Sequence, residues 1–458
     1  MAKYFASRHV KLVILILIFT LASSILSTSC SKDQSATDQS ATSDNQLSGN
    51  QPATGDNSAE PREPYEIKMW VFPLGDSAKQ KEIFDGIVKD FEAQNSNITV
   101  NIQTMPWSNR EQKLMTALAA HRGPDTVYMN TDILLQFAYN NMVLPLDEYI
   151  TEEQKNDFFE QSFKVNSYEG KVYGLPVLQE MMTYIYNLDI LKEIGLDEGT
   201  LPSTFDEFET MLKNLKAKGK TGFSMDLAGS LRVSGYYAQL WSEGGAPFSP
   251  DGKVTINDAI NIKVLERIKR WYKAGYLPQD AVTMNDNASL GKFLAGDVAS
   301  HYISAGNLVT EDLKNVKFNW AIGPILKGAA GGKADYAIGS FCITKDSKDP
   351  ALVYKFLDLF TNKENLTAIN KFSGYLPPRK SIPNIFEDVK GYDAVLGQLD
   401  CAYSEPSHPA ERQVMSSIIA AIQAALTESK TPGQALGDAA KDAEDTLQKY
   451  KDIKDAQQ

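Results

Sequence analysis

The sequence predicts an α/β protein with at least two lobes, and two observations support this fold class. Segments typical of strands alternate with amphipathic helices after the N-terminal region, which is the pattern of a mostly parallel, layered sheet. The chain also has 458 residues, of which 43% are hydrophobic. Because this length exceeds what one ordinary hydrophobic core covers, we expect at least two cores.

The first thirty residues have the form of a signal peptide. Three basic residues precede an apolar stretch over residues 12–26, which is shorter than the about 20 residues of a membrane-spanning helix. The small residues before Cys30 resemble a bacterial lipobox, although Leu26 lies four places before the cysteine and not the usual three. We therefore expect residues 1–29 to be removed and Cys30 to carry a lipid. The alternative is an ordinary signal peptide with an incidental cysteine.

Residues 30–64 are expected to form a flexible tether between the lipid and a folded body over residues 65–458. This segment holds almost no large apolar side chain and carries a short DQSAT repeat. Such a composition cannot bury enough surface to offset the entropy of ordering the chain. The sequence therefore predicts a lipoprotein on the extracellular face of the cell envelope, or on the periplasmic side in a Gram-negative cell.

The body opens with regularly alternating elements. Strands are expected at 65–72, 98–103 and 125–129, and amphipathic helices at 78–94 and 110–121. Farther along, Thr151 with Gln154 and Thr204 with Glu207 have capping-box spacing at helix starts. The remaining elements are expected as a buried strand within 174–187, a helix at 264–275, strands at 318–325 and 336–344, and helices at 410–426 and 432–450.

The net charge of the chain limits the partners that it can bind, and its cysteine content limits the disulfides that it can form. The formal net charge is −12, so the chain is a poor candidate for binding nucleic acid or an anionic membrane face. Besides Cys30, only Cys342 and Cys401 are present. A disulfide is permitted outside the cell, but the apolar setting of Cys342 equally fits a buried free thiol.

The common catalytic signatures are absent from the sequence. It contains no GxSxG elbow, Walker-type loop, HExxH, CxxC or GxGxxG. The four histidines lie far apart, so we expect neither a metal site nor a cofactor. Paired carboxylates such as Asp132 and Glu180 could serve a glycosidase, although a chain this acidic offers many such pairs by chance.

Several stretches of the body, in order, resemble the extracellular solute-binding proteins of bacterial ABC importers, from the branch that includes maltose-binding protein. They include "GPDTVYMN", "LPLDEYI", "YEGKVYGLPVLQEMMTYIYN", "LWSEGGAPF", "FLAGDVASHY", "AIGSFCITKDSKDPALVYKFLDLF" and "SGYLPPRKS". The resemblance implies a type II periplasmic-binding-protein-like fold, with a hinge and a ligand cleft between two lobes. Lobe one would comprise 65–178 and 340–375, and lobe two 183–335 and 379–450.

The resemblance also implies a function. The chain would be a monomeric receptor without enzymatic activity that captures a sugar, with an oligosaccharide favoured, and delivers it to the transmembrane subunits of an ABC permease. Two alternatives stay open: a secreted lipoprotein enzyme acting on glycans, and a binding protein for another solute such as a phosphodiester, a peptide or a metal.

Four polar residues are candidates for the cleft. Glu180 falls where the family's crossing strand places a sugar-binding glutamate, with Gln179 beside it; the alternative is a core carboxylate paired with a cation. Asp132 falls where the family has a sugar-contacting aspartate, with Asn130 nearby, and could equally be a helix N-cap. Met129 replaces an aromatic platform of maltose-binding protein, which argues against maltodextrin itself.

The other candidates are aromatic, basic or small. Sugar rings stack their C–H faces on aromatic side chains, although any one aromatic residue is commonly part of a core. Arginines could recognise an acidic sugar or orient Asp132 or Glu180. We assign Trp271 to a core. The candidates are Trp107, Trp241, Tyr302, Tyr375, Ser340, Arg232 and Arg412.

Overall fold

The computed structural model describes residues 63–404 and 408–457. The expected signal peptide, lipidated Cys30 and the tether as far as residue 62 lie outside this range. The described residues form one compact unit, to which the following description applies. No helix among the described residues is long and apolar enough to cross a membrane.

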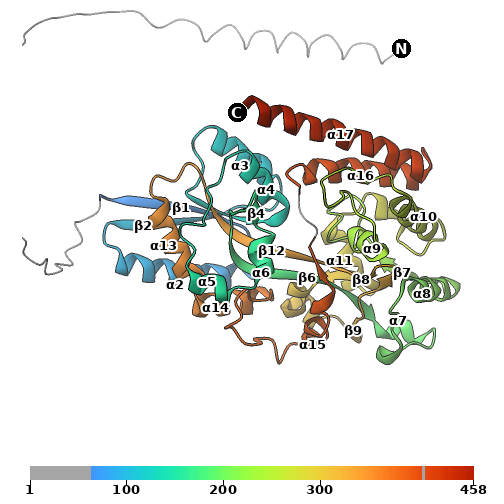
Figure 1. Ribbon diagram of the computed structural model, residues 1–458. Coiled ribbons are helices and arrows are strands. Elements are labelled where there is room, and N and C mark those ends of the chain that lie inside the picture. The colour runs from blue at the N-terminus through green and yellow to red at the C-terminus, as the bar shows by residue number, and fades with distance from the viewer. Residues whose placement is uncertain (1–62, 405–407, 458) are drawn as a thin grey trace, which may run out of the picture. The chain divides into compact units, whose positions relative to one another are not determined.

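One mixed β-sheet runs through the whole body, in the order β2-β1-β3-β12-β6-β8-β7, with β13 beside β12 and β9 beside β6 (Figure 1). β1 pairs in parallel with β2 and β3, whereas β12 is antiparallel to both β3 and β6. The strands are β1 (Tyr65–Val71), β2 (Ile98–Thr104), β3 (Thr126–Asn130), β6 (Leu175–Asn187), β7 (Thr221–Ser224), β8 (Val298–Ser304), β9 (Trp320–Gly323), β12 (Ala334–Ile343) and β13 (Ala402–Tyr403). Two small hairpins are separate: β4 (Ser167–Tyr168) with β5 (Lys171–Val172), and β10 (Lys327–Gly328) with β11 (Gly331–Gly332).

The sheet passes through two separate hydrophobic cores. The first is built from residues between Ile67 and Leu178 and between Phe341 and Ile382. The second is built mainly from residues between Met181 and Ile338 and between Phe386 and Ala443. We call the residues around these cores lobe one and lobe two. Each core buries the apolar sides of the elements that surround it.

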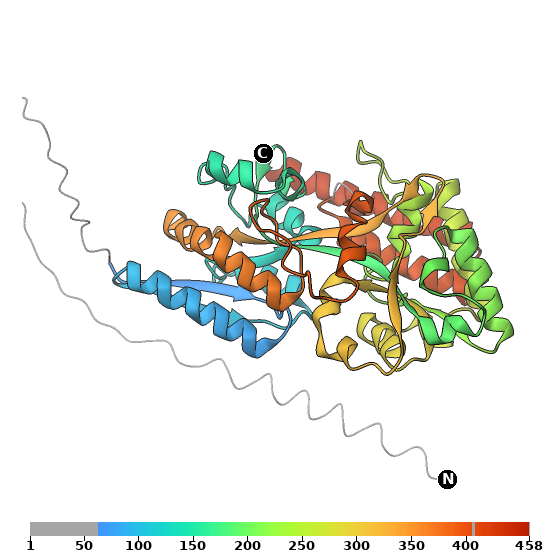
Figure 2. The ribbon, with the colours of Figure 1, turned by 90° about the horizontal axis from the view of Figure 1, so that it is seen from below.

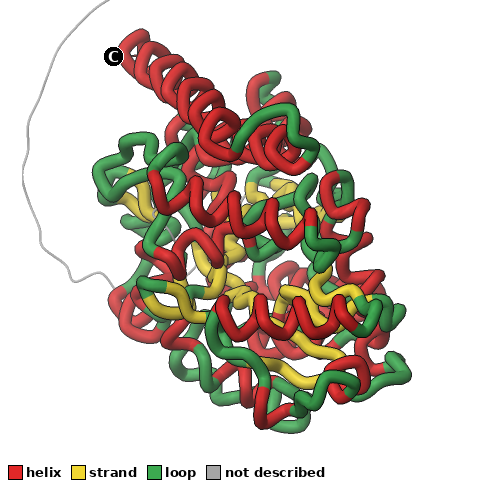
Figure 3. The backbone as a smooth tube through the Cα atoms, turned by 90° about the vertical axis from the view of Figure 1, so that its right-hand side faces the viewer, coloured by secondary structure: helices red, strands yellow, loops and turns green. Residues whose placement is uncertain are grey.

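Helices cover much of the main sheet, whereas a few strand segments lie at the outer edge of the molecule (Figure 3). In lobe one, α2 and α13 lie side by side (Figure 2). Its helices are α2 (Ser77–Gln94), α3 (Arg110–Ala119), α4 (Thr131–Tyr139), α5 (Glu152–Asp157), α6 (Glu160–Lys164), α13 (Pro350–Phe360) and α14 (Lys363–Ser373). In lobe two, α16 and α17 run along each other. Its α-helices are α7 (Leu188–Lys192), α8 (Phe205–Ala217), α9 (Tyr236–Glu243), α10 (Ala259–Lys273), α11 (Asp286–Leu294), α12 (Glu311–Lys314), α15 (Tyr392–Leu396), α16 (Glu411–Leu426) and α17 (Pro432–Gln457).

Two long strands connect the lobes. β6 leaves the first core at Leu178 and enters the second at Met181, so Gln179 and Glu180 lie at the crossing. β12 crosses in the opposite direction, with a change of register between Gly339 and Ser340. Gly339 is required there because the hydroxyl of Tyr128 lies 1.9 Å from the position that a Cβ atom would take.

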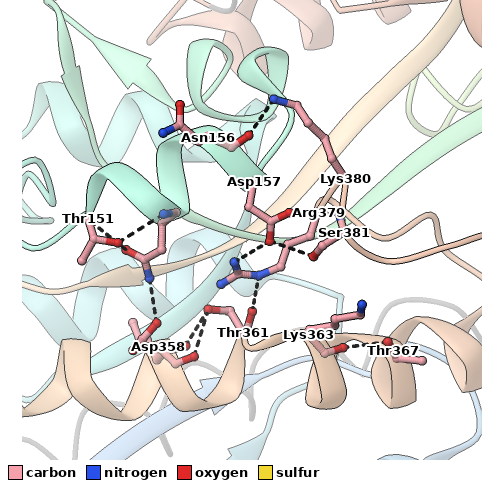
Figure 4. Close-up of polar contacts among 12 residues, drawn as sticks. Thr151, Asn156, Asp157, Asp358, Thr361, Lys363, Thr367, Arg379, Lys380 and Ser381 are labelled. Atoms are coloured by element: carbon pink, nitrogen blue, oxygen red, sulfur yellow. Dashed lines mark hydrogen bonds and ion pairs between the residues drawn. The ribbon is translucent and has the colours of Figure 1, made fainter.

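A third connection follows α14 and is fixed to lobe one by Arg379. Its Nη1 donates to Asp157 Oδ2 at 2.9 Å, its Nε donates to the Thr361 carbonyl oxygen at 2.8 Å, and Ser381 also donates to Asp157 (Figure 4). The guanidinium lies 4.1 Å from the centre of the Phe158 ring. Arg379, expected in lobe two, is thus bonded to lobe one, because its partners come from α5 and the end of α13.

Most expected elements are confirmed, and both capping boxes are present at α5 and α8. The helix predicted from residue 264 begins at Ala259 as α10. In its first turn the apolar Ile260 is exposed while the polar Asn261 is buried and donates to the Ala246 and Thr255 carbonyls, so the apolar period alone does not reveal the start. Cys342 is a buried free thiol and Cys401 is also free. Trp271 is fully buried, as expected.

Candidate functional site

A cavity of about 680 Å³ lies between the two cores, beside the crossing strands, and is lined from both lobes. Its volume falls within the usual range of small-molecule sites. Seven residues singled out in the sequence line it. They are Trp107, Asn130, Asp132, Glu180, Arg232, Tyr375 and Arg412.

Glu180 interrupts an apolar run because it faces this cavity. It pairs with Ala337 of β12 in the sheet, and it is partly exposed between the buried residues Leu178 and Met181. Burial is the main cause that raises the pKa of the Tyr128 and Tyr375 phenols, and the nearby Glu180 carboxylate is the second. The carboxylate therefore lies close to two aromatic hydroxyls that also line the cavity.

Asp132 lies in the first turn of α4, where a carboxylate is favoured by the positive end of the helix dipole. Its Oδ1 lies 3.4 Å from Nη2 of Arg110, and its Oδ2 lies 3.2 Å from Nη1 of Arg412. Burial opposes ionisation, but Arg110, Arg412 and Arg232 outweigh it and lower the pKa of Asp132. The alternative reading of Asp132 as a helix N-cap is wrong, since the N-cap residue is Asn130 and Asp132 is already helical.

Arg412 connects the lobes electrostatically. It comes from α16 of lobe two, and its two partners, Asp132 and Glu111, belong to lobe one. Its Nε lies 3.8 Å from Glu111 Oε2. Its side chain is 32% exposed, so this pair is partly wet and lies at the cavity rather than within a core.

Arg232 forms a buried network in lobe two. Its Nη1 donates to Asp335 Oδ1 at 2.8 Å, and its Nε and Nη2 donate to Glu411 Oε1 at 2.9 and 2.7 Å. Burial raises the pKa of both Asp335 and Glu411, and Arg232 offsets only part of that effect. Burial lowers the pKa of Arg232, but the carboxylates around it prevail and raise it.

Trp107 is the most exposed aromatic side chain on the cavity wall, at 38%. Its indole nitrogen donates to the Pro73 carbonyl at 2.9 Å, and its ring stacks on Phe72. These contacts fix the ring while leaving much of it accessible. Tyr128, Tyr336 and Tyr375 supply further aromatic surface.

The other four candidates lie outside the cavity lining. Gln179 is buried and bonded to Ser162 and Tyr336. Ser340 is buried in lobe one and accepts from Asn166 at 2.6 Å. Tyr302 accepts from the backbone N–H of Asp335 at 2.9 Å. Trp241 is 3% exposed and packs against Tyr403 and Arg232. Each supports a strand or a side chain behind the cavity wall.

The structure adds residues that the sequence did not single out. Arg110, Glu111, Tyr128, Asp335 and Gln413 also line the cavity. Asn130 Oδ1, Gln413 Oε1 and Arg110 Nε are buried and have no hydrogen-bond partner among the described residues. Such unsatisfied groups are uncommon in native proteins and require an explanation. Among these added residues, Arg110 is the one that the sequence could have indicated, because it lies three residues after the candidate Trp107.

The described residues contain no group of three or more histidine, cysteine, aspartate or glutamate side chains that could hold a metal ion. Three of the carboxylates at the cavity, Glu111, Asp132 and Asp335, lie beside arginines. What the site offers is a mixture of charged groups, amides and aromatic faces suited to a polar organic solute.

Two α/β lobes joined by crossing strands, with a polar cavity between them, define a two-lobed binding protein. The chain belongs to the bacterial extracellular solute-binding protein family, whose model matches residues 86–394. This membership confirms the expected fold and the expected class of a solute-binding protein rather than an enzyme.

Individual proteins are similar over most of the chain. A putative binding protein of Brucella abortus is 26% identical over 84% of this chain and 94% of its own. The maltodextrin-binding protein MdxE of Bacillus subtilis is 25% identical over 78% and 86%. Among solved structures, an ABC substrate-binding protein of Listeria monocytogenes in complex with cycloalternan superposes with a TM-score of 0.73, at 21% identity over 84% of this chain and 99% of that one.

Proposed function

We propose that this protein is the sugar-binding component of an ABC importer, which captures an oligosaccharide between its two lobes and delivers it to the transmembrane subunits of a permease. The observation that carries the proposal is the composition of the cavity wall. Carboxylates, amides and aromatic rings from both lobes converge on one volume of about 680 Å³.

The chemistry of that wall suits a carbohydrate. Sugar hydroxyls donate to carboxylates and to amide oxygens such as Asn130 Oδ1 and Gln413 Oε1, which have no partner among the described side chains. Trp107 and Tyr375 provide faces against which the C–H patches of a sugar ring can stack. The maltodextrin-binding protein MdxE and the Listeria protein in complex with cycloalternan point to the same class of ligand.

Capture by lobe closure fits the arrangement of the walls. Glu180 lies on a strand that crosses between the lobes, Asp132 lies in lobe one and Arg412 in lobe two. A ligand that contacts all three binds the closed arrangement more tightly than the open one, and therefore shifts the population toward closure.

We further propose that the body is attached outside the cell by a lipid on Cys30 and the tether after it. The support is the sequence pattern before Cys30 and the polar composition of the segment that follows. Labelling cells with a fatty-acid probe should mark the wild-type protein and not a Cys30→Ala variant. A variant that still takes up the label would remove this part of the proposal.

A thermal-shift screen tests the sugar-binding function. The purified protein is heated with a broad panel of oligosaccharides, and in parallel with phosphodiesters, peptides and amino acids. A ligand present at 100 times its dissociation constant adds about 2.7 kcal/mol to stability, which is readily measured. Stabilisation by one or more oligosaccharides is expected. Stabilisation only by solutes of another class would contradict the proposal.

A further inference from the structure

The charges that line the cavity are unequal. Four carboxylates, from Glu111, Asp132, Glu180 and Asp335, face three guanidiniums, from Arg110, Arg232 and Arg412, and among the described lining residues there is no lysine or histidine. Glu411, which accepts two hydrogen bonds from Arg232, adds a fifth carboxylate directly behind the wall. In and directly behind the wall, the carboxylates therefore outnumber the guanidiniums.

The three guanidiniums are also already bonded. Arg232 uses three of its nitrogens on Asp335 and Glu411, Arg412 lies 3.2 Å from Asp132, and Arg110 lies 3.4 Å from the same carboxylate. An anionic ligand that bound one of these paired nitrogens would have to displace a carboxylate of the protein. The displaced carboxylate would then lie buried and unpaired beside a second negative charge, which is strongly unfavourable.

Two of the three unsatisfied polar atoms at the cavity have the same preference. Arg110 Nε is a donor, whereas Asn130 Oδ1 and Gln413 Oε1 are acceptors. They require a donor, which a hydroxyl or an ammonium group supplies and which an ionised carboxylate or phosphate lacks.

On the basis of the proposed sugar-binding function, we infer that the cavity accepts uncharged or amino-bearing sugars and excludes acidic ones. The arginines thus hold the carboxylates of the site in place, and do not bind a negatively charged group of the ligand. The role left open by the sequence, recognition of an acidic sugar by Arg232 or Arg412, is the one that this charge arrangement disfavours.

The test measures thermal stabilisation of the full chain at low ionic strength, where charge effects are largest. The neutral probes are maltotriose, cellotriose and mannotriose, the amino probe is the glucosamine trimer of chitosan, and the acidic probe is trigalacturonate. Stabilisation by a neutral or amino probe and not by trigalacturonate is expected. Stabilisation by trigalacturonate above all others would overturn the inference while leaving sugar binding intact. If no sugar of any charge binds, the proposed function itself fails, and the inference with it.

A variant sharpens the test. Glu111→Gln removes one carboxylate from the wall and releases Arg412 from one of its two partners, at a side chain that is 23% exposed and therefore tolerant of change. The affinity for trigalacturonate relative to the neutral probe should rise by about tenfold, the effect of one unit charge about 12 Å away at an effective dielectric constant of about 20. Glu209→Gln, whose partner is Arg270 within lobe two, is the matched control and should leave the ratio unchanged. An unchanged ratio in Glu111→Gln as well would contradict the inference.

Discussion

Glu180 is the residue of β6 that we expect to contact the ligand, because its side chain lines the cavity. It is the partly exposed carboxylate in the 13-residue strand β6, where almost every other side chain is buried. An apolar run marks such a strand in the sequence, and the single charge within it marks where the strand passes a polar space. Its position at the cavity follows from the crossing between the two cores.

Glu180→Gln should weaken sugar binding and leave the fold intact. The amide replaces one acceptor by a donor, and the loss of a hydrogen bond to a charged group typically costs about 1.5 to 3 kcal/mol. Titration calorimetry and the melting temperature of the ligand-free protein are measured together, with the exposed Glu193→Gln as control. A large loss of melting temperature at unchanged affinity would show that Glu180 is a structural residue.

Asp132 should contribute to stability in a pH-dependent manner. Because its pKa is lowered in the folded state, its contribution is fully present above the ordinary value of 3.8 and is lost as the pH falls through the lower folded value. Asp132→Asn should therefore be less stable than the wild type by about 2 kcal/mol at neutral pH. The difference should be constant down to about pH 5 and shrink below about pH 4. Urea unfolding of both proteins across this range checks it, and a difference that grows toward acid would contradict the account.

At the scale of elements, the pattern of the sequence predicted most strands and helices because each depends on residues close together in the chain. The apolar period of α2, the capping boxes of α5 and α8 and the apolar run of β6 are local features. The network around Arg232 could not be predicted in this way, since its partners Asp335 and Glu411 lie 103 and 179 residues away.

The choice of aromatic candidates shows the same limit. Trp107 and Tyr375 line the cavity, whereas Trp241 and Tyr302 are buried behind it. Each is a large aromatic residue in a mixed apolar and polar stretch, and its local sequence does not show whether its side chain faces the cavity or the core. Whether such a residue lines the cavity or lies in the core depends on the face of the packed lobe that it occupies. That face is a property of the tertiary structure.

Arg379 should matter more for stability than its neighbour in the same connecting segment. Arg379→Met removes an ion pair with Asp157 and a bond to the Thr361 carbonyl, both largely buried. The expected loss is about 3 kcal/mol, at the lower end of the range for breaking a buried pair. Lys380→Met removes an exposed bond to the Asn156 carbonyl and should change stability by no more than about 0.5 kcal/mol. Equal losses in chemical denaturation would contradict the role assigned to Arg379.

At the scale of the whole molecule, the ion pair of Arg412 with Asp132 joins the two lobes without a ligand. Arg412→Ala should therefore increase the mean radius of gyration of the ligand-free protein, because a contact that restrains opening is lost. Arg270→Ala removes an arginine paired with Glu209 within lobe two and serves as the control. If small-angle scattering finds the same radius for both variants and the wild type, this pair does not restrain the lobes.

The central claim, that a sugar is captured by closure of the two lobes around the cavity, is tested most directly by small-angle scattering with and without a saturating oligosaccharide identified in the thermal-shift screen. The account predicts a smaller radius of gyration in the presence of the sugar, because the ligand contacts both lobes and favours the closed arrangement. The Glu180→Gln variant should require more sugar to reach the same radius. An unchanged scattering curve at a sugar concentration that calorimetry shows to be saturating would contradict capture by closure.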